Sequence, residues 1–197
     1  MFIALLAAVC GYLLGSVPFG LLITKAAGLG DIRKIGSGNI GTTNVLRTGR
    51  VSLAIATLLA DIGKAAVAAF LFKYFYSETM GLIAGVAAIF GHNFPIWLHF
   101  KGGKGVASTL GVLLVLTPWV GILTCLTWVA MAFAFHYSSL SAITALCLAP
   151  VYALFFATPQ AALCYTFLTF LSLWRHRENI KRLIHGQESK ISFKRKK

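Results

Sequence analysis

Long runs of apolar residues constrain this chain more than any other feature of its sequence. The first run extends from residue 2 to residue 24 without a charged side chain, and a helix of that length can cross a hydrocarbon core about 30 Å thick. Of all residues, 58% are hydrophobic and 12% are charged, whereas a soluble domain carries about 25% charged residues. The alternating segments of about ten residues that are typical of a β-barrel do not occur. The sequence therefore predicts an all-α integral membrane protein.

Seven apolar segments are candidates for transmembrane helices, some of them short or broken. Residues 106–135 are too long for one straight crossing, and Pro118 favours a break in the middle of them. The fourth predicted span is then too short to cross alone. We expect a single membrane domain over residues 1–197. Its spans cover residues 2–24, 51–76, 80–100, 106–116, 119–135, 140–157 and 160–174, and a basic tail follows at 175–197.

The basic residues fall on one side of this topology. Of the 18 Lys and Arg residues, all but Lys64 and Lys73 lie in segments that follow odd-numbered spans. Under the positive-inside rule that side is cytoplasmic, which makes the N-terminus periplasmic and the C-terminus cytoplasmic. A six-span alternative, with 106–135 as one bent crossing, would place the tail opposite the first basic loop. Because topology accounts for the net charge of +13, we expect contact with membrane lipid and no nucleic-acid partner.

A glycine-rich loop follows the first span. Gly36, Gly38 and Gly41 permit positive φ, so consecutive amides can form an anion-binding nest. Lys34 and Arg47 add positive charge. No strand precedes the glycines, so the loop is not a dinucleotide-binding fingerprint. These features favour a phosphate site, and a solvated loop without a ligand is the alternative. Neutral hydrogen-bonding side chains lie among the glycines at Ser37, Asn39, Thr42, Thr43 and Asn44.

A second basic loop precedes the fourth predicted span and reads Lys101-Gly102-Gly103-Lys104-Gly105. Glycine amides and two lysines at the start of a helix favour an anion. The spacing is not that of a Walker A motif, so ATP binding is not indicated. The alternative is that the lysines only anchor the third span.

Some charged or titratable residues lie inside the predicted spans, and Asp61, Lys64 and His92 are the candidates for a structural or functional role. Asp61 and Lys64 are three residues apart, on one face of the second predicted helix. Charges at membrane depth are costly, so we predict a structural ion pair, with Lys64 facing the site as the alternative. For His92, where the third span loosens, packing and function both stay open.

The four cysteines are far apart in apolar runs, so no metal site and no cofactor are predicted.

The tail begins with a run of polar and basic residues. If the seventh helix continues past the membrane, then His176, Asn179 and Leu183 share one face of it. That face could point back at the loops.

Two anion-binding loops on one membrane face suggest an enzyme that joins a soluble phosphate ester to a lipid-phase substrate. The chain has five acidic residues, with no paired carboxylates and no catalytic triad. The chemistry must then need little general base, which indicates an activated donor. A membrane transporter for a phosphorylated anion is the alternative, but its glycine-rich breaks should fall near the bilayer centre.

Three motifs run in order over nearly the whole chain. They are Gly36-Ser37-Gly38-Asn39-Ile40-Gly41-Thr42-Thr43-Asn44 with Arg47, then Gly91-His92-Asn93-Phe94-Pro95 with Phe100-Lys101-Gly102-Gly103-Lys104-Gly105, then Arg175-His176-Arg177-Glu178-Asn179 with Glu188. Together they resemble the motifs of the bacterial membrane glycerol-3-phosphate acyltransferases that use acyl-phosphate. The resemblance implies seven spans in the bacterial inner (plasma) membrane and an active site at the cytoplasmic face.

The resemblance also implies a reaction. The 1-hydroxyl of glycerol 3-phosphate would attack the carbonyl of a fatty acyl-phosphate, giving lysophosphatidic acid and phosphate in the first step of phospholipid synthesis. The phosphate of the substrate would take the proton. No acyl-CoA or acyl carrier protein donor is expected, since no histidine has the Asp five positions later that those transferases carry. The soluble enzyme that makes acyl-phosphate is an expected partner.

Residue roles follow from the same resemblance. Ser37, Lys104 and His176 would act in catalysis through orientation and electrostatics, and Glu188 would be structural. Acyl-phosphate would contact Ser37, Gly38, Asn39, Gly41, Thr43, Asn44, Gly102 and Gly103. Glycerol 3-phosphate would contact Arg47, Lys104, His176, Asn179 and Ser141.

Two positions depart from the family pattern. Thr42 stands where the family usually has a small residue. The family sequence Ser-Leu-x-Ser ends here in Ala142, so a phosphate contact is either lost or supplied by Ser139 or Ser141.

Overall fold

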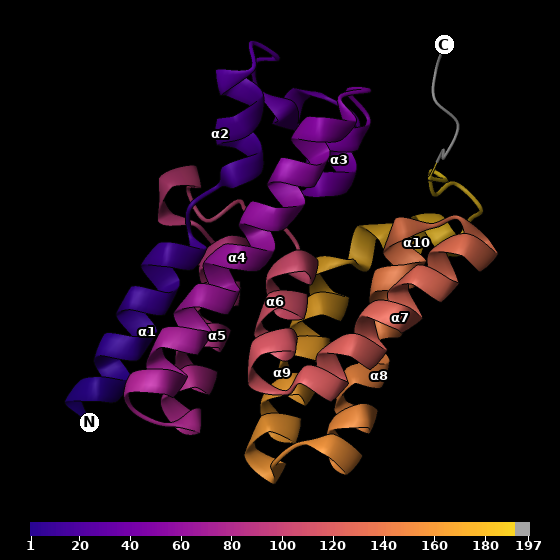
Figure 1. Cartoon of the computed structure of the whole chain (residues 1–197). Helices are drawn as coiled ribbons and strands as arrows, with labels where there is room; N and C mark the ends of the chain where they lie inside the picture. The colour runs from indigo at the N-terminus through magenta and orange to yellow at the C-terminus, as the bar shows by residue number, and fades with distance from the viewer. Residues whose placement is uncertain (192–197) are drawn as a thin grey trace. The chain divides into compact units, whose positions relative to one another are not determined.

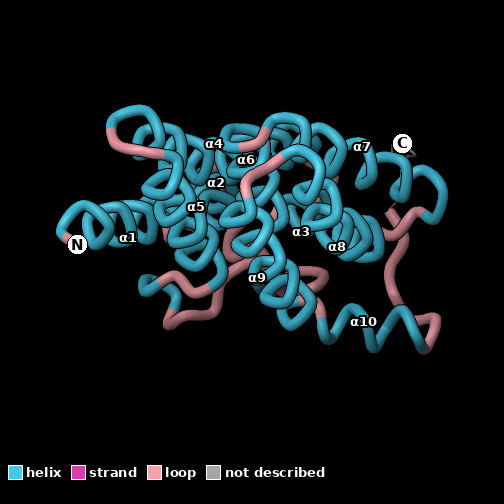
Figure 2. Tube along the Cα trace, turned by 90° about the horizontal axis from the view of Figure 1, so that it is seen from below, coloured by secondary structure: helices cyan, strands magenta, loops and turns pink. Residues whose placement is uncertain are grey.

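The computed structural model describes residues 1–191, which form helices joined by loops (Figures 1 and 2). The predicted all-α class is confirmed for this part of the chain. Met1–Leu116 form one compact unit, and a second unit begins at Thr117. The single domain over residues 1–197 stays a prediction, and residues 192–197 of the predicted tail lie outside the described residues.

The two units differ in how their helices are connected. The first unit contains α1 (Phe2–Gly15), α2 (Phe19–Ala26), η1 (Ile32–Lys34), α3 (Thr42–Leu46), α4 (Val51–Phe75), α5 (Glu78–Asn93), η2 (Ile96–Leu98) and α6 (Val106–Leu116). The second unit contains α7 (Pro118–Phe135), α8 (Ser138–Phe156), α9 (Pro159–Arg175) and α10 (Arg177–Ile184). Long loops thus occur in the first unit, and short turns join α7, α8 and α9.

Helix lengths support a protein that spans the membrane. The predicted break near Pro118 is confirmed, because α6 ends one residue before Thr117 and α7 has the proline in its first turn. α6 is a short apolar helix, as predicted, and the seventh predicted segment forms α9, of 17 residues. The count of seven crossings and the orientation of the termini stay predictions. Among residues 1–191, the five segments long and apolar enough to cross are Phe2–Ala26, Val51–Phe75, Glu78–Leu98, Pro118–Phe135 and Ser138–Phe156.

Two predicted spans are interrupted. The first, residues 2–24, divides at residues 16–18 into α1 and α2, because Pro18 has no N–H to continue the helical hydrogen bonds. The third, residues 80–100, leaves the α-helix after Asn93, ahead of Pro95. Residues 94–100 instead form a turn of 3₁₀ helix and two left-handed residues, His99 and Phe100, at φ 49° and 60°.

Small residues bring α1 and α5 into close contact, and the two helices run side by side in Figures 1 and 2. A methyl group on Gly11 would overlap the backbone of Ala84, and one on Gly15 would overlap the backbone of Ala88. The outer side of α1 carries apolar side chains, of which Leu5 is 64% exposed. Without a hydrophobic drive between helices in lipid, such close backbone contact is a main source of association.

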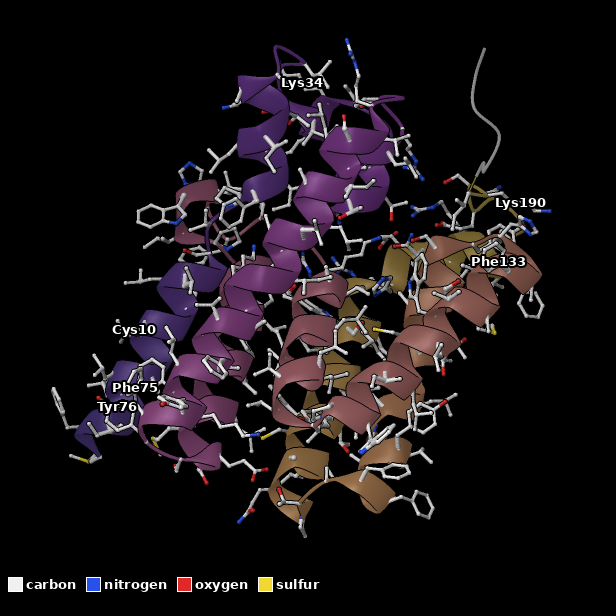
Figure 3. The ribbon with its side chains drawn as sticks, viewed as in Figure 1. Cys10, Lys34, Phe75, Tyr76, Phe133 and Lys190 are labelled. Atoms are coloured by element: carbon white, nitrogen blue, oxygen red, sulfur yellow. The ribbon has the colours of Figure 1, made fainter. Side chains whose placement is uncertain are left out.

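The long helix α4 separates the two ends of the first unit. Lys34 ends η1, in the segment between α2 and α4, whereas Phe75 and Tyr76 lie at the far end of α4 (Figure 3). The basic first loop is therefore at the opposite end of this unit from the short turn that joins α4 to α5. In the second unit, Phe133 of α7 is 66% exposed and presents an aromatic ring outward (Figure 3).

The contact between α1 and α5 makes a prediction about stability. Gly15→Ala should lower the thermal stability of the purified protein in detergent, because the methyl group has no space against Ala88. Gly63→Ala in α4 is the matched control, since its methyl group would meet nothing within 4 Å. Alanine is the better helix former by about 1 kcal/mol, so the control should be as stable as the parent or more so. Equal melting temperatures for both variants would contradict the close packing.

Candidate functional site

Asn44 organises the first glycine-rich loop. Its side chain is 2% exposed, and its Oδ1 accepts a hydrogen bond from the N–H of Ser37 at 3.0 Å. Its Nδ2 lies 2.8–3.0 Å from the carbonyl oxygens of Ile32, Ile35 and Asn39. Both ends of the amide thus hold the loop together. The predicted contact of Asn44 with acyl-phosphate stays a prediction that its hydrogen bonds do not support.

The glycines of the first loop differ in conformation. Gly36 and Gly38 have the positive φ expected of them, at 57° and 70°, whereas Gly41 is extended at φ −84°. The N–H of Gly38 donates to Ile35 O at 3.0 Å, and that of Gly41 donates to Asn39 Oδ1 at 2.9 Å. These amides close the loop on itself, so they do not form the row of amides open to an anion that the sequence suggests.

Some polar side chains of the first loop are exposed to solvent, among them those of Ser37, Thr43 and Arg47. A methyl group on Gly36 would overlap Asn44 Oδ1 and would lie 2.8 Å from Arg47 Cδ, so the arginine runs along the bare backbone of this glycine. The exposed donors of this loop are therefore hydroxyl and guanidinium groups more than amides.

The acidic residue of the first loop is neutralised locally. Both carboxylate oxygens of Asp31 accept hydrogen bonds from the Arg33 side chain, at 2.6–3.1 Å. The Arg33 side-chain hydrogen bond is the main reason that the pKa of Asp31 lies well below its ordinary value. This pairing places a guanidinium directly against the carboxylate and offsets its negative charge.

The second glycine-rich loop packs on the end of α5. The N–H of Gly103 donates to His92 O at 3.0 Å, and that of Gly102 donates to Asn93 O at 3.2 Å. A methyl group on Gly102 would overlap the carbonyl of His92 and the ring of Pro95. The two glycines are thus required for close packing, and their N–H groups already have acceptors. Their predicted contacts with acyl-phosphate stay predictions, and Lys104, which follows them, is half-buried.

A buried charged cluster lies behind the second loop. Lys64 Nζ and Asp61 Oδ1 are 2.8 Å apart, so the residues predicted to pair do so. Lys64 also donates to Val17 O at 2.8 Å and lies 2.9 Å from His92 Nδ1. Sequence reasoning did not place His92 in this cluster, since it follows Lys64 by 28 positions. Within residues 1–191, no group of three His, Cys, Asp or Glu side chains is arranged to hold a metal ion.

In the second unit, the carboxylate of Glu188 accepts hydrogen bonds from three side chains. Its Oε1 accepts from Ser139 Oγ at 2.9 Å and from Asn179 Nδ2 at 2.8 Å, and its Oε2 accepts from Arg182 Nε at 2.7 Å. Burial alone would raise the pKa of Glu188, but the hydrogen bonds from Asn179, Arg182 and Ser139 bring it below its ordinary value. These bonds tie the start of α8, the helix α10 and the segment after α10 together, which supports the structural role predicted for Glu188.

The predicted third motif does not lie on one continuous helix. α9 ends at Arg175 and α10 begins at Arg177, so the seventh helix does not continue unbroken, which was the condition for His176 and Asn179 to share one face of it. His176 sits at the break, is 2% exposed, and its Nδ1 lies 2.8 Å from Ser172 O. Ser141 is fully buried and donates to Tyr137 O at 2.8 Å. Both candidates for the family serine at Ala142, Ser139 and Ser141, thus have acceptors inside this unit.

The central place of Asn44 makes a prediction about loop integrity. Asn44→Asp should expose the first loop to trypsin, because a carboxylate oxygen would replace the donor that faces three carbonyl oxygens, at a cost of about 1–3 kcal/mol. Cleavage at Lys34 and Arg47 should speed up roughly tenfold. Asn39→Asp is the matched control, since it keeps the oxygen that accepts from Gly41. Equal cleavage rates for the two variants would rule out Asn44 as the organiser.

Glu188 makes a prediction about pH. Its folded-state pKa is lowered, so its stabilisation is complete above the ordinary carboxyl pKa and is lost as the pH falls through the folded-state value. Glu188→Gln should therefore lower the melting temperature by several degrees at pH 7 and by progressively less below about pH 4. Glu178→Gln, whose parent side chain is 59% exposed, should show little change at either pH. A Glu188 effect that is independent of pH would contradict this account.

The comparisons with known proteins agree with one another. The family model described as Glycerol-3-phosphate acyltransferase matches residues 5–186. A protein of that name from Rhodospirillum rubrum is 56% identical over 198 residues, covering 96% of this chain and 91% of the relative. One from Maricaulis maris is 54% identical, covering 99% of this chain and 90% of the relative.

A solved structure is similar over nearly the whole chain. The crystal structure of PlsY, an integral membrane glycerol 3-phosphate acyltransferase, in its glycerol 3-phosphate form superposes with a TM-score of 0.90 at 33% identity, covering 96% of each chain. Its lysophosphatidic acid form gives a TM-score of 0.88 at 32% identity, covering 96% of this chain and 95% of that one. On sequence and structure together, this chain belongs to the glycerol-3-phosphate acyltransferase family of the PlsY type.

Proposed function

We propose that this protein transfers a fatty acyl group from acyl-phosphate to the 1-hydroxyl of glycerol 3-phosphate, giving lysophosphatidic acid and phosphate. The observation that carries the proposal is family membership over nearly the full chain together with the side chains that the first loop turns outward. A phosphorylated substrate is the ligand that Arg47 and the neighbouring hydroxyl groups suit best. The product is the first intermediate of phospholipid synthesis.

The acyl-phosphate is a mixed anhydride, so its carbonyl is already activated. In the transfer, the substrate hydroxyl oxygen bonds to the acyl carbon, the bond from that carbon to the phosphate oxygen breaks, and the hydroxyl proton passes to a phosphate oxygen. The protein then needs to position two anions and to stabilise negative charge. This fits a chain with five acidic residues in all.

The first unit supplies two kinds of contact in this proposal. Ser37 and Thr43 donate hydroxyl hydrogen bonds to the acyl-phosphate, while Arg47 and Lys104 pair with the phosphate of glycerol 3-phosphate. Ser37 and Lys104 have their effect on the reaction through orientation and charge. Asn44, Gly102 and Gly103 act mainly by shaping the loops, because their polar groups are engaged inside the unit. Direct contacts from Gly38, Asn39 and Gly41 remain predictions from the resemblance.

For the second unit, His176, Asn179 and Ser141 stay predicted ligands of glycerol 3-phosphate. Each is at most 5% exposed. Glu188 would hold Asn179 in place through their hydrogen bond. The bacterial inner membrane, a cytoplasmic active site and supply of the donor by a soluble enzyme belong to the same proposal.

A transporter for a phosphorylated anion is the competing function. Transporters place glycine-rich breaks near the middle of their spans. Here the first loop connects α2 to α4 and the second connects η2 to α6, so both lie at helix ends. This position favours an enzyme that works at the membrane surface.

The donor assignment has a direct test. The purified protein in lipid is mixed with glycerol 3-phosphate and either palmitoyl-phosphate or palmitoyl-CoA, and lysophosphatidic acid is measured. We expect product from the acyl-phosphate and background from the CoA ester. If neither donor gives lysophosphatidic acid, the proposed function is wrong. If the acyl-phosphate and the CoA ester are used equally, the assignment of the donor is wrong. Uptake of glycerol 3-phosphate into proteoliposomes without acylation would favour the transporter.

Lys104 provides a test of the substrate site. Lys104→Ala should raise the KM for glycerol 3-phosphate roughly 10- to 100-fold, because a charge-assisted hydrogen bond contributes about 1.5–3 kcal/mol. Lys25→Ala, which removes an exposed lysine at the end of α2, should leave the KM as it is. An unchanged KM in the Lys104 variant would remove this lysine from the site.

A further inference from the structure

His92 joins the buried ion pair of α4 to the second glycine-rich loop. The residue is 4% exposed, and its Nδ1 lies 2.9 Å from Lys64 Nζ. Its carbonyl accepts the N–H of Gly103 at 3.0 Å. The other edge of its ring lies on the same glycine, since a methyl group on Gly103 would overlap Nε2 and would lie 2.7 Å from Cδ2. Backbone and ring of His92 thus fix one residue of the loop.

The contacts of Lys64 indicate which nitrogen of the His92 ring carries the proton. Lys64 Nζ donates to Val17 O at 2.8 Å, pairs with the charge of Asp61 Oδ1 at 2.8 Å and lies 2.9 Å from His92 Nδ1, which is itself 3.5 Å from Asp61 Oδ1. An ammonium can only donate, so its contact with the ring makes Nδ1 the acceptor. With Nδ1 as the acceptor, the ring carries its proton on Nε2. Lys64 therefore holds the imidazole by one nitrogen and leaves the opposite edge against Gly103.

Stability alone does not call for such a cluster. Charges at membrane depth are costly, and a buried ion pair can often be replaced by packed apolar side chains without loss of stability. A polar cluster of this kind is of use where it fixes one geometry. The geometry that this cluster fixes is that of the residue directly before Lys104.

We infer that His92 is a positioning residue for acyl transfer, with Lys64 holding its ring, and that it sets the place of Gly103 and so of Lys104. The inference rests on the proposed function, in which Lys104 binds glycerol 3-phosphate. In this inference, Gly103 of the second loop lacks a side chain because the imidazole of His92 on α5 packs against its backbone. The inference also gives the Asp61–Lys64 pair on α4 a function, which is to hold the imidazole of His92.

A double-mutant cycle between His92 and Gly103 tests the contact. Gly103→Ala should lower kcat/KM for glycerol 3-phosphate at least 100-fold, because the methyl group overlaps the ring. His92→Asn keeps an acceptor near the position of Nδ1 for Lys64 but removes the ring edge that faces Gly103. It should raise the KM for glycerol 3-phosphate about tenfold, with a smaller change in the KM for acyl-phosphate.

The combined variant gives the decisive result. His92→Asn with Gly103→Ala should recover at least tenfold in kcat/KM over Gly103→Ala alone, because the methyl group then occupies the space of the ring. If the loss of kcat/KM in the combined variant is the product of the losses in the two single variants, the inference is overturned. A His92→Asn protein that melts at a lower temperature but keeps both KM values would also overturn it, since that is the result of a structural role alone.

His99→Asn is the matched control. His99 is exposed, lies in the turn just before the second loop, and has a left-handed conformation at φ 49°, which asparagine adopts readily. This variant should keep the kinetics and the melting temperature of the parent. A rise in KM equal to that of His92→Asn would show that any change near the loop has the same effect.

Hydrogen exchange separates this inference from the proposed function. Loss of the ring should speed exchange of the amides at 101–105, whether or not the protein acylates glycerol 3-phosphate. If the parent protein is inactive while His92→Asn still speeds exchange there, the proposed function fails and His92 remains a residue that positions the loop. If the parent is active while exchange and kinetics are unchanged in the variant, the positioning role fails.

Discussion

One buried ammonium, that of Lys64, contacts three separate segments of the first unit. Lys64 is 4% exposed and lies in a helix apolar enough to cross a membrane, where water is absent and each polar group must find a partner in the protein. Its acceptors come from three places: Val17 at the break between α1 and α2, Asp61 on α4, and His92 on α5. The break in the first predicted span therefore has a structural consequence, because it places the Val17 carbonyl next to the Lys64 ammonium.

Glycine has two distinct uses in this protein. Gly36 and Gly38 adopt positive φ, which lets the first loop turn sharply. At Gly15 in α1 and Gly103 in the second loop, the absence of a side chain instead lets another group lie directly on the backbone. The loops are thus compact supports for arginine, lysine and hydroxyl side chains. Amide nests, which glycine-rich loops often provide, play a smaller part.

Each candidate motif has an inner residue that holds it together. Asn44 does so for the first loop, His92 for the second, and Glu188 for the segment that contains Asn179 and Arg182. All three carry polar side chains whose hydrogen bonds are made within their own unit. A motif residue can therefore be essential for a site without touching a ligand, because it fixes the residues that do.

The sequence by itself determined the features that depend on neighbours along the chain. The apolar runs predicted helices, Pro118 predicted the break after α6, and the three-residue spacing predicted the pairing of Asp61 with Lys64. Only the tertiary structure placed His92 on Gly103 and Lys64, and only it closed the first loop around Asn44. The reason is that hydropathy and helical spacing act locally, whereas His92 and Lys64 are 28 positions apart and meet only once α4 and α5 have packed.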